Sequence, residues 1–387
     1  MSTPAFDAVV VGAGIVGCAT AYELARAGLS VALLDKGDIG GAVTGGSLAC
    51  VGTHMISRDE IPLLMRSCQR WSGLENELDF DFEYNACGQM RFVRAPADLE
   101  VARGWLALEA GFGLEGALLD PAAVRGIAPA LRGPVLAATW SPRDATVNPF
   151  LACRAFVEAA QRLGCRVHPG TGVTAIHTQA GRITGVTAGA LRIATKYIVN
   201  AAGPWADAVA RLAGCALPIA PRKAQCLATT AVAPIIPCVV GACESAGGVE
   251  AGYTQIQQAA HGQILFNTVL AGGVRTEARP EDDLAVDRQF VLDSVETLLW
   301  LFPDLRNVTL LRSWCAYEAV TPDDHFLIGP VDGVDGLLVA AGDGGTGFNR
   351  APMIGEMIAQ WASGNRAVPA MTPYLPSRFG TEARVAA

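Results

Sequence analysis

The chain opens with two short apolar runs separated by a segment of mixed apolar and polar residues. Residues 8–11 and 30–34 have the length and composition of strands buried on both faces of a sheet. The intervening residues 15–27 predict a helix, and Gly28 is suited to end it. A buried strand, a helix and a second buried strand in this order predict an α/β fold.

The pattern of apolar positions predicts further elements along the rest of the chain. Residues 149–163 form the clearest amphipathic helix. Its expected apolar face consists of Phe150, Cys153, Phe156, Val157 and Ala160. Other helices are expected at 61–78, 101–112, 287–301 and 348–362, after the capping sequence Leu119-Asp120-Pro121 and from Ala206. Strands are expected at 80–92, 164–168, 172–177, 196–203, 225–232, 262–269, 312–318 and 336–341, with a hairpin near Gly181 and a loop at 140–149.

The turn after the first strand carries glycines at a specific spacing. Gly12, Gly14 and Gly17 read G-x-G-x-x-G, which permits a tight turn, close approach of the backbone to a pyrophosphate and close packing of the helix on the strand. The N-terminus of that helix is an anion site. Asp35 ends the second strand, where an acid accepts hydrogen bonds from ribose hydroxyls. The glycines alone also occur by chance or in flexible loops, but together with the strands, helix and acid they predict a dinucleotide site.

Residues 37–54 are almost all small. They suit a backbone pressed against a flat or phosphorylated ligand, with the Thr44 and Ser47 hydroxyls as donors. A flexible surface loop would carry more charge than this segment does. His54 closes the segment and is a candidate active-site residue, with a structural role as the alternative.

A second glycine cluster near the C-terminus indicates that the ligand is long enough to reach two separate parts of the chain. Residues 342–347 follow a buried strand and precede a helix, but no second strand ending in an acid comes after them. We interpret the cluster as a helix N-terminus directed at the same cofactor. The expected binding elements at 8–54, 165–210 and 336–362 are far apart in the chain, whereas an NAD domain would be contiguous. This arrangement favours FAD.

The domain prediction follows from these elements. We expect a discontinuous Rossmann-like FAD-binding domain at 1–80, 140–215 and 325–387. An α+β substrate domain with a mainly antiparallel sheet is expected to occupy 81–139 and 216–324.

Composition limits the remaining functions. The net charge of −8 argues against a nucleic-acid surface, and no apolar stretch is long enough for a membrane span. The chain enters its first strand within six residues, which leaves no room for a signal peptide, so we expect a cytoplasmic protein. The eleven cysteines form no C-x-x-C pair, which disfavours a metal or iron–sulfur site. Apolar neighbours predict buried thiols at Cys18, Cys50, Cys153, Cys165 and Cys315.

Four ordered motifs carry a family resemblance over nearly the whole chain. They are Val-Val-Gly-Ala-Gly-Ile-Val-Gly at the first turn, Asn-Ala-Ala-Gly-Pro-Trp-Ala at 200–206, Val-Thr-Pro-Asp with Ile-Gly-Pro at 320–330, and Ala-Ala-Gly-Asp-Gly-Gly-Thr-Gly at 340–347. The chain resembles the D-amino-acid oxidase superfamily in its glycine oxidase and sarcosine oxidase branch. It is most similar to FAD-carrying β subunits of heteromeric opine or D-hydroxyproline dehydrogenases.

The resemblance implies hydride transfer from a C–N bond of an amino acid, opine or cyclic imino acid to flavin N5. It also implies partner subunits that carry further redox cofactors. The implied FAD-binding residues are Gly12, Gly14, Ile15, Val16, Asp35, Lys36, Thr44, Gly45, Gly46, Ser47, Leu48, Val173, Ala202, Gly203, Trp205, Gly342, Gly345, Thr346, Gly347 and Phe348.

The substrate side departs from the family at one position. Amino-acid-oxidising relatives often place an arginine for the substrate carboxylate three residues before Thr-Pro-Asp, and here that residue is Glu318. Either the substrate is held differently or carries a positive group, or Glu318 pairs with a neighbour. The candidate carboxylate partners are Arg350, Arg275 and Arg222, each with a surface or structural role as its alternative. Tyr253 lies in the expected substrate domain, on a strand expected to cover the substrate. Its side chain either contacts the substrate or packs within the sheet.

Two other functions stay open at this point. A 2-hydroxy-acid or polyol dehydrogenase of the same fold would need a base for the O–H proton, and His54 is a candidate. A flavin-binding structural subunit would leave catalysis to a partner.

Overall fold

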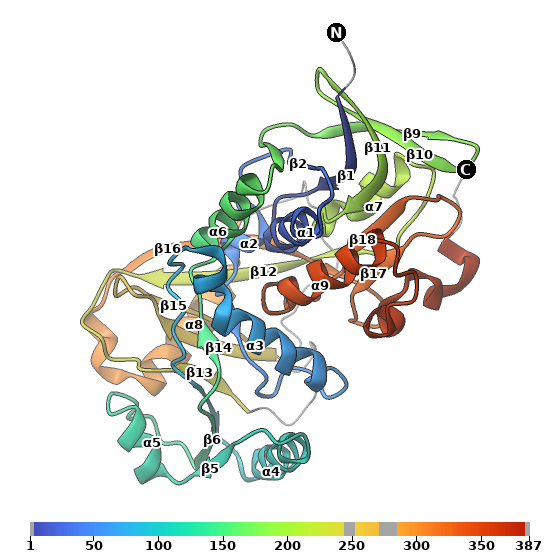
Figure 1. Ribbon diagram of the computed structural model, residues 1–387. Helices are drawn as coiled ribbons and strands as arrows, with labels where there is room; N and C mark the ends of the chain where they lie inside the picture. The colour runs from blue at the N-terminus through green and yellow to red at the C-terminus, as the bar shows by residue number, and fades with distance from the viewer. Residues whose placement is uncertain (1–3, 244–251, 271–284, 384–387) are drawn as a thin grey trace.

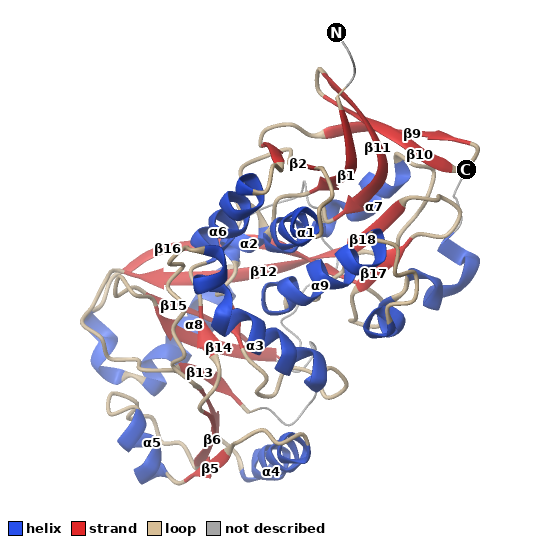
Figure 2. Ribbon diagram, viewed as in Figure 1, coloured by secondary structure: helices blue, strands red, loops and turns tan. Residues whose placement is uncertain are grey.

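The computed structural model describes residues 4–243, 252–270 and 285–383, and its two large sheets form the two halves of the molecule (Figures 1 and 2). Each sheet has eight strands. Strands from both ends of the chain contribute to the first sheet, and the middle of the chain supplies the second. The α/β fold expected from the sequence is confirmed.

The first sheet has a parallel core. Its strand order is β17-β18-β11-β1-β2-β8, and the five strands from β18 to β8 run parallel. The antiparallel strand β17 closes one edge, and the β9–β10 hairpin pairs with β11. The strands are β1 (Ala5–Val11), β2 (Val31–Leu34), β8 (Arg166–His168), β9 (Val173–Gln179), β10 (Arg182–Ala188), β11 (Leu191–Asn200), β17 (Leu327–Pro330) and β18 (Leu337–Ala341).

Helices cover both faces of this sheet. Helices α1 (Ile15–Arg26), α6 (Pro149–Arg162) and α9 (Gly347–Ala362) pack on one face, and α7 (Ala206–Arg211) with the hairpin packs on the other. Figure 1 shows α1 and α9 side by side although they come from opposite ends of the sequence. Gly355 permits this contact, because a Cβ there would lie 2.9 Å from the backbone of Ala19. Helix α3 (Ile61–Leu78) packs against α9.

The second sheet is mixed. Its order is β16-β12-β15-β14-β13-β4-β6-β5, and one neighbouring pair, β13 and β4, is parallel while the others are antiparallel. The expected mainly antiparallel sheet is therefore confirmed with one parallel pair. The strands are β4 (Gln89–Val93), β5 (Ala117–Leu119), β6 (Ala137–Ser141), β12 (Ala220–Thr229), β13 (Val239–Ala242), β14 (Gly252–Gln258), β15 (Ile264–Leu270) and β16 (Leu310–Val320).

One face of the second sheet is apolar and the other is polar. Helices α8 (Arg288–Leu301) and α5 (Pro121–Ile127) pack on a core that includes Met90, Phe92 and Phe266. The alternation along β4 directs Gln89 and Arg91 to the opposite face. Helix α4 (Pro96–Gly111) lies beside β4 and β5. The short elements are α2 (Val43–Gly46), β3 (Cys50–Val51), β7 (Ala145–Thr146) and the 3₁₀ turns Gly203–Trp205, Pro303–Asn307, Pro369–Tyr374 and Pro376–Ala383.

Several sequence-based boundaries were wrong. The strand expected at 80–92 occupies only 89–93, because two Glu75 side-chain bonds to the backbone of Phe82 and Tyr84 hold the preceding loop. The loop expected at 140–149 contains the end of β6 and all of β7. Phe150 was assigned to the buried face of its helix but is 53% exposed. The domain boundaries stay a prediction.

No described helix is long and apolar enough to cross a bilayer. Within the described ranges, no disulfide forms and no three acidic, histidine or cysteine side chains are grouped to hold a metal ion. Cys18, Cys153 and Cys165 are buried as expected, whereas Cys50 and Cys315 are only partly buried.

Candidate active site

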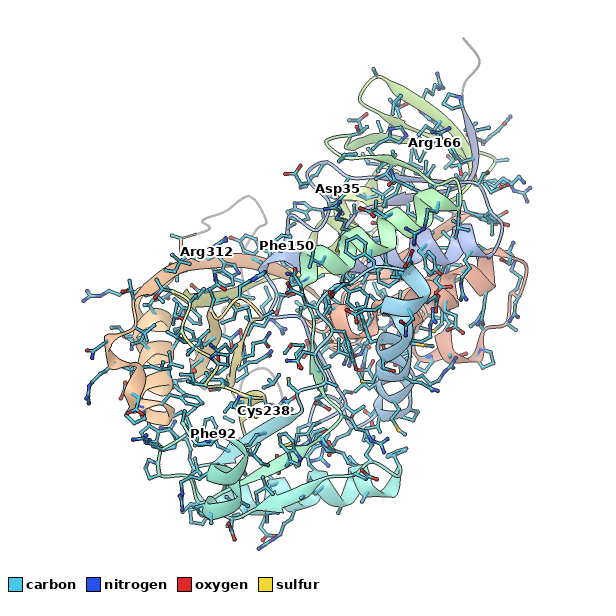
Figure 3. The ribbon with its side chains drawn as sticks, turned by 60° about the vertical axis from the view of Figure 1, so that its left-hand side comes forward. Asp35, Phe92, Phe150, Arg166, Cys238 and Arg312 are labelled. Atoms are coloured by element: carbon cyan, nitrogen blue, oxygen red, sulfur yellow. The ribbon has the colours of Figure 1, made fainter. Side chains whose placement is uncertain are left out.

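A cavity of about 820 Å³ lies between the carboxyl ends of the first sheet's parallel strands and the polar face of the second sheet. It is lined by the β1–α1 turn, the 41–50 loop, the ends of β11 and β18, and strands β4, β12, β14 and β16. Figure 3 shows Asp35 in the half built on the first sheet, and Phe92 and Cys238 in the half built on the second. A cavity of this volume is at the upper end of the usual range for ligand sites.

The β1–α1 turn forms one end of the cavity with little room to spare. Gly12 has a φ of +107°, and a Cβ at this position would lie 2.3 Å from the carbonyl oxygen of Ala201 at the end of β11. A Cβ on Gly17 would lie 1.8 Å from the carbonyl oxygen of Gly12. Both contacts require glycine, as the motif predicted, and they bring the start of α1 to the cavity wall.

The loop of small residues continues this wall. The Thr44 hydroxyl accepts a hydrogen bond from the Ile15 N–H at 3.0 Å, which joins the loop to the first turn of α1. The Gly46 carbonyl accepts a bond from the indole of Trp314 at 2.9 Å, which joins the loop to the second sheet. The loop is therefore bonded to both halves of the molecule at Thr44 and Gly46, and the segment is not the flexible surface loop considered as an alternative.

Asp35 and its neighbours complete the nucleotide end. The Asp35 carboxylate accepts hydrogen bonds from the Ala13 and Gly37 N–H groups, so it lies directly beside the glycine turn. Lys36 lies over the ring of Trp205, with the ammonium nitrogen 3.6 Å from the ring centroid. Buried Asn200 donates to the Ala206 carbonyl at 2.7 Å and thereby shapes the turn after β11.

The start of α9 meets the second sheet at a cluster of charges. A Cβ on Gly345, where φ is +85°, would lie 2.3 Å from a Glu318 carboxylate oxygen. The Asp343 carboxylate accepts a hydrogen bond from the Gly345 N–H at 3.3 Å. Burial, together with the nearby Glu318 charge, raises the pKa of Asp343 to about 6.

Glu318 faces the cavity but is already paired. It accepts two hydrogen bonds from Arg222 on the neighbouring strand, from Nε at 3.0 Å and from Nη2 at 2.8 Å. Arg222 also donates to the Gly344 carbonyl and lies 3.6 Å from Asp324. Glu318 therefore pairs with a neighbour, which was one of the alternatives considered for it. The same ion pair occupies Arg222, which was a candidate partner for the substrate carboxylate.

Arg350 is likewise engaged. It lines the cavity from the first turns of α9, is 2% exposed, and forms a buried ion pair with Glu60. Its Nη1 donates to the Thr346 carbonyl at 3.3 Å. The third candidate, Arg275, lies outside the described residues.

Tyr253 projects from β14 into the cavity lining. Burial raises the pKa of its phenol, so the group stays protonated through the neutral pH range. It can therefore donate a hydrogen bond to a ligand that lies against the polar face of the second sheet. This face, formed by β4, β12, β14 and β16, is called the roof of the cavity below.

Most of the predicted cofactor residues meet at this cavity. Those in its lining are Gly12, Gly14, Ile15, Val16, Asp35, Lys36, Thr44, Gly46, Ser47, Leu48, Val173, Ala202, Gly203, Trp205, Gly345, Thr346, Gly347 and Phe348. Gly45 and Gly342 are not in the lining. A Cβ on Gly45 would meet Gly40 and Phe150 instead, and a Cβ on Gly342 would meet Thr321.

His54 is not brought to the cavity either. It is fully buried, and its two ring nitrogens lie 2.9 Å from Glu109 and 2.7 Å from the Thr139 hydroxyl. The backbone N–H groups of Thr53 and His54 each donate a hydrogen bond to the buried Asp144 carboxylate at 3.3 Å. These contacts give His54 a structural place behind the cavity wall, and its role in catalysis stays a prediction without a contact to support it.

The sequence interpretation missed the polar residues of the second sheet. Gln89, Arg91, Gln255 and Asn267 all line the cavity. The Gln-Met-Arg-Phe pattern of β4 carried a signal, because polar and apolar residues alternate there as in a strand with one polar face. The position of these strands in the sheet was needed to identify what their polar face meets.

The residues present fit an FAD molecule. Helices α1 and α9 both begin at the cavity, and neither has a side-chain cap from its own N-cap residue, Gly14 or Thr346. Such helix ends favour anionic or electron-rich groups. The glycine contacts described above leave the backbone exposed at the α1 turn, and Asp35 lies beside it as an acceptor. The residues of the α1 turn, the 41–50 loop and the α9 turn would hold the cofactor.

Comparison with known proteins agrees with this assignment. The sequence profile of the DAO family, described as FAD dependent oxidoreductase, matches residues 7–361. The chain is 26% identical to the hydrogen cyanide synthase subunit HcnC of Pseudomonas protegens, over 97% of each chain. It is 25% identical to the sarcosine oxidase subunit beta of an Arthrobacter species, over 97% of this chain and 91% of that one. The solved structure of L-proline dehydrogenase from P. horikoshii superposes with a TM-score of 0.88 and 27% identity, covering 98% of both chains.

Proposed function

The chain belongs to the DAO family of FAD-dependent oxidoreductases, and from that membership we propose that it oxidises the C–N bond of an amino acid, opine or cyclic imino acid. The observation that carries the proposal is that the glycine turns of the first sheet and the polar face of the second sheet line one and the same cavity. FAD held by the α1 turn, the 41–50 loop and the α9 turn would supply a two-electron oxidant for the substrate. Loss of a hydride from the carbon of a neutral amine would leave a protonated imine, which water would hydrolyse to a carbonyl compound and the free amine or ammonia.

The residues of this chain contribute position and electrostatics. The start of α9 places a helix N-terminus at the cavity, where it stabilises negative charge. The protonated Tyr253 phenol can donate a hydrogen bond to the substrate. The pairing of Glu318 with Arg222 neutralises a carboxylate that would otherwise repel an anionic substrate.

Two relatives support a further proposal about assembly. Both the hydrogen cyanide synthase and the sarcosine oxidase relatives are named as subunits. We therefore propose that this chain is the substrate-oxidising β subunit of a heteromeric dehydrogenase, with partner subunits that carry further redox cofactors. Affinity purification of the tagged chain from its native cells, followed by metal and flavin analysis of the complex, tests this. Purification of the chain alone, fully active with a physiological acceptor, would contradict it.

The alternatives have less support. Oxidation of a hydroxy acid needs a base to take the O–H proton, and the candidate base His54 is buried behind the wall with both ring nitrogens engaged. A purely structural subunit has no use for a polar roof that faces the cofactor elements.

A dye-linked assay of the purified chain separates these functions. We expect turnover with a subset of amino acids, opines or cyclic imino acids and none with the matching 2-hydroxy acids. Turnover with hydroxy acids alone would favour the second function. A flavin-containing chain that reduces no dye with any donor would favour the structural role.

A further inference from the structure

The roof of the cavity contains an arginine whose side chain lies across the sheet. Arg91 is on β4, beside Gly241 on β13, which in turn pairs with Gln255 on β14. Since Gly241 has no side chain, Arg91 can lie over it: a Cβ on Gly241 would be 3.4 Å from Arg91 Nη1 and 3.6 Å from its Cγ. The guanidinium therefore extends over β13 toward the centre of the roof.

The described contacts of this guanidinium are all to neutral groups. With the Gln89 amide turned to satisfy its neighbours, its oxygen accepts bonds from Arg91 Nε and Nη2 at 3.0 Å, and its nitrogen donates to Asp144 at 2.8 Å. Nη2 also reaches the His54 carbonyl at 3.5 Å, and Nη1 reaches the Ala242 carbonyl at 3.4 Å. Bonds of that length are weak and readily replaced.

The other two arginines in the lining differ from Arg91 in this respect. Arg222 is bonded to Glu318, and Arg350 is bonded to Glu60. Among the described residues, Arg91 lies within ion-pair distance of no carboxylate. A guanidinium has five N–H donors, and the described contacts of Arg91 leave one Nη1 hydrogen for a ligand.

Two buried carboxylates, Asp144 and Glu109, bond to Gln89 and His54, which are two of the residues whose oxygens accept bonds from Arg91. Asp144 bonds to Gln89, Ser141 and the 53–54 backbone, and Glu109 bonds to His54 and the Met55 N–H. Burial lowers the pKa of the Arg91 guanidinium, and nearby charges, those of Asp144 and Glu109 among them, oppose that shift. The result is a cation that Gln89 holds in position, with one Nη1 hydrogen and a long Nη1 bond to the Ala242 carbonyl that a carboxylate can replace.

We propose that Arg91 binds the carboxylate of the substrate, in place of the arginine that the family resemblance implied at position 318. This inference rests on the proposed oxidation of an amino acid, opine or cyclic imino acid, and it names the residue that holds the carboxylate of that substrate. The bound substrate then directs its carboxylate toward Arg91 on β4, and not toward Glu318 on β16. Arg91 and Tyr253 are two strands and one side-chain row apart, roughly 12 Å between Cα atoms. A substrate can therefore contact both side chains at once.

Binding of simple carboxylates, followed by the change they cause in the flavin absorption spectrum, tests the assignment without turnover. The probes are propionate and glutarate, with propionamide as the neutral counterpart. Arg91→Gln is expected to weaken binding of both carboxylates by about 10–100-fold, the usual worth of a charge-assisted bond, and to leave propionamide unchanged. Arg91→Lys keeps the charge but loses the fork geometry and is expected to weaken binding by about 10-fold.

Arg94→Gln is the matched control. Arg94 directly follows β4, is exposed and stacks on Trp300 with its guanidinium carbon 4.4 Å from the ring centroid, and it does not line the cavity. This variant should bind the carboxylates as the wild type does. If Arg91→Gln fails to retain FAD or to fold, Arg91→Lys carries the test, because it keeps the cation that Asp144 and Glu109 face.

The kinetic arm separates this inference from the function on which it rests. With a carboxylate-bearing amine that the enzyme oxidises, Arg91→Gln should raise KM far more than it lowers kcat. Unchanged carboxylate binding in both Arg91 variants would overturn the assignment and leave amine oxidation intact. Arg91-dependent carboxylate binding with no flavin reduction by any amine would overturn the oxidation instead. A wild type that binds no carboxylate would also overturn the assignment.

Discussion

At the scale of single residues, the site is organised by pairing of charges. Glu318 takes the position where the family resemblance implied an arginine, and Arg222 on the neighbouring strand neutralises it. Asp343 has no described cationic partner that bonds to it, and its pKa is raised to about 6 by burial and by Glu318. These two carboxylates therefore lead to different predictions, one about ion pairing and one about pH.

The first prediction concerns the Arg222–Glu318 pair. The Arg222 side chain is only 8% exposed. Glu318→Ala therefore leaves a nearly buried cation whose remaining described partners are Asp324 and the Gly344 carbonyl. A double-mutant cycle with Arg222→Ala should give a coupling free energy of roughly 2–4 kcal/mol in urea unfolding. A coupling near zero would mean that the pair does not form in solution.

The second prediction concerns pH. A carboxyl whose pKa is raised in the folded state favours folding when it is protonated, so this contribution is complete below about pH 4 and is lost as the pH rises to about 6. Asp343→Asn removes the penalty on the ionised form. The Tm of the variant relative to wild type should therefore rise between pH 4 and pH 6 and stay constant above that. A Tm difference that is the same at every pH would show that Asp343 has an ordinary pKa.

At the scale of elements, the position of α1 against β1 decides whether the nucleotide end exists. The helix can begin at the cavity only because Gly17 lets its first turn touch the Gly12 carbonyl. The sequence could predict this element well, since the strand, glycines, helix and acid are all local signals. Observed α1 ends within one residue of the expected boundary, and α3 has the expected bounds of 61–78.

A pair of matched substitutions tests this contact. Gly17→Ala places a methyl 1.8 Å from the Gly12 carbonyl oxygen, so we expect a loss of roughly 2–4 kcal/mol in the free energy of unfolding and loss of bound FAD. Gly73→Ala makes the same chemical change within α3, where nothing lies within 4 Å, and should stabilise the protein by roughly 0.5–1 kcal/mol. Equal effects of the two substitutions on urea unfolding would contradict the packing described for α1.

At the scale of the whole molecule, the site depends on contacts between segments that are distant in sequence. The glycine motifs at both ends of the chain and the use of one cofactor could be predicted, because each motif is a local pattern with a specific spacing. The roof could not be predicted in the same way: Arg91, Gly241 and Gln255 are brought together by the parallel β13–β4 pairing, which no local pattern specifies. His54 was wrongly placed for the same reason. It directly follows the cofactor loop in the sequence, but contacts with Glu109 and Thr139, which are distant in sequence, hold its side chain behind the cavity wall.

The central claim is that both glycine turns hold one FAD beneath a roof that binds an amine. Anaerobic titration of the purified chain with carboxylate-bearing amines tests it most directly, with FAD content measured after denaturation. We predict one FAD for each chain and complete bleaching of the oxidised flavin band by at least one such amine, but not by the matching hydroxy acid. A purified, folded chain that contains no flavin, or whose flavin no amine bleaches, would contradict the account.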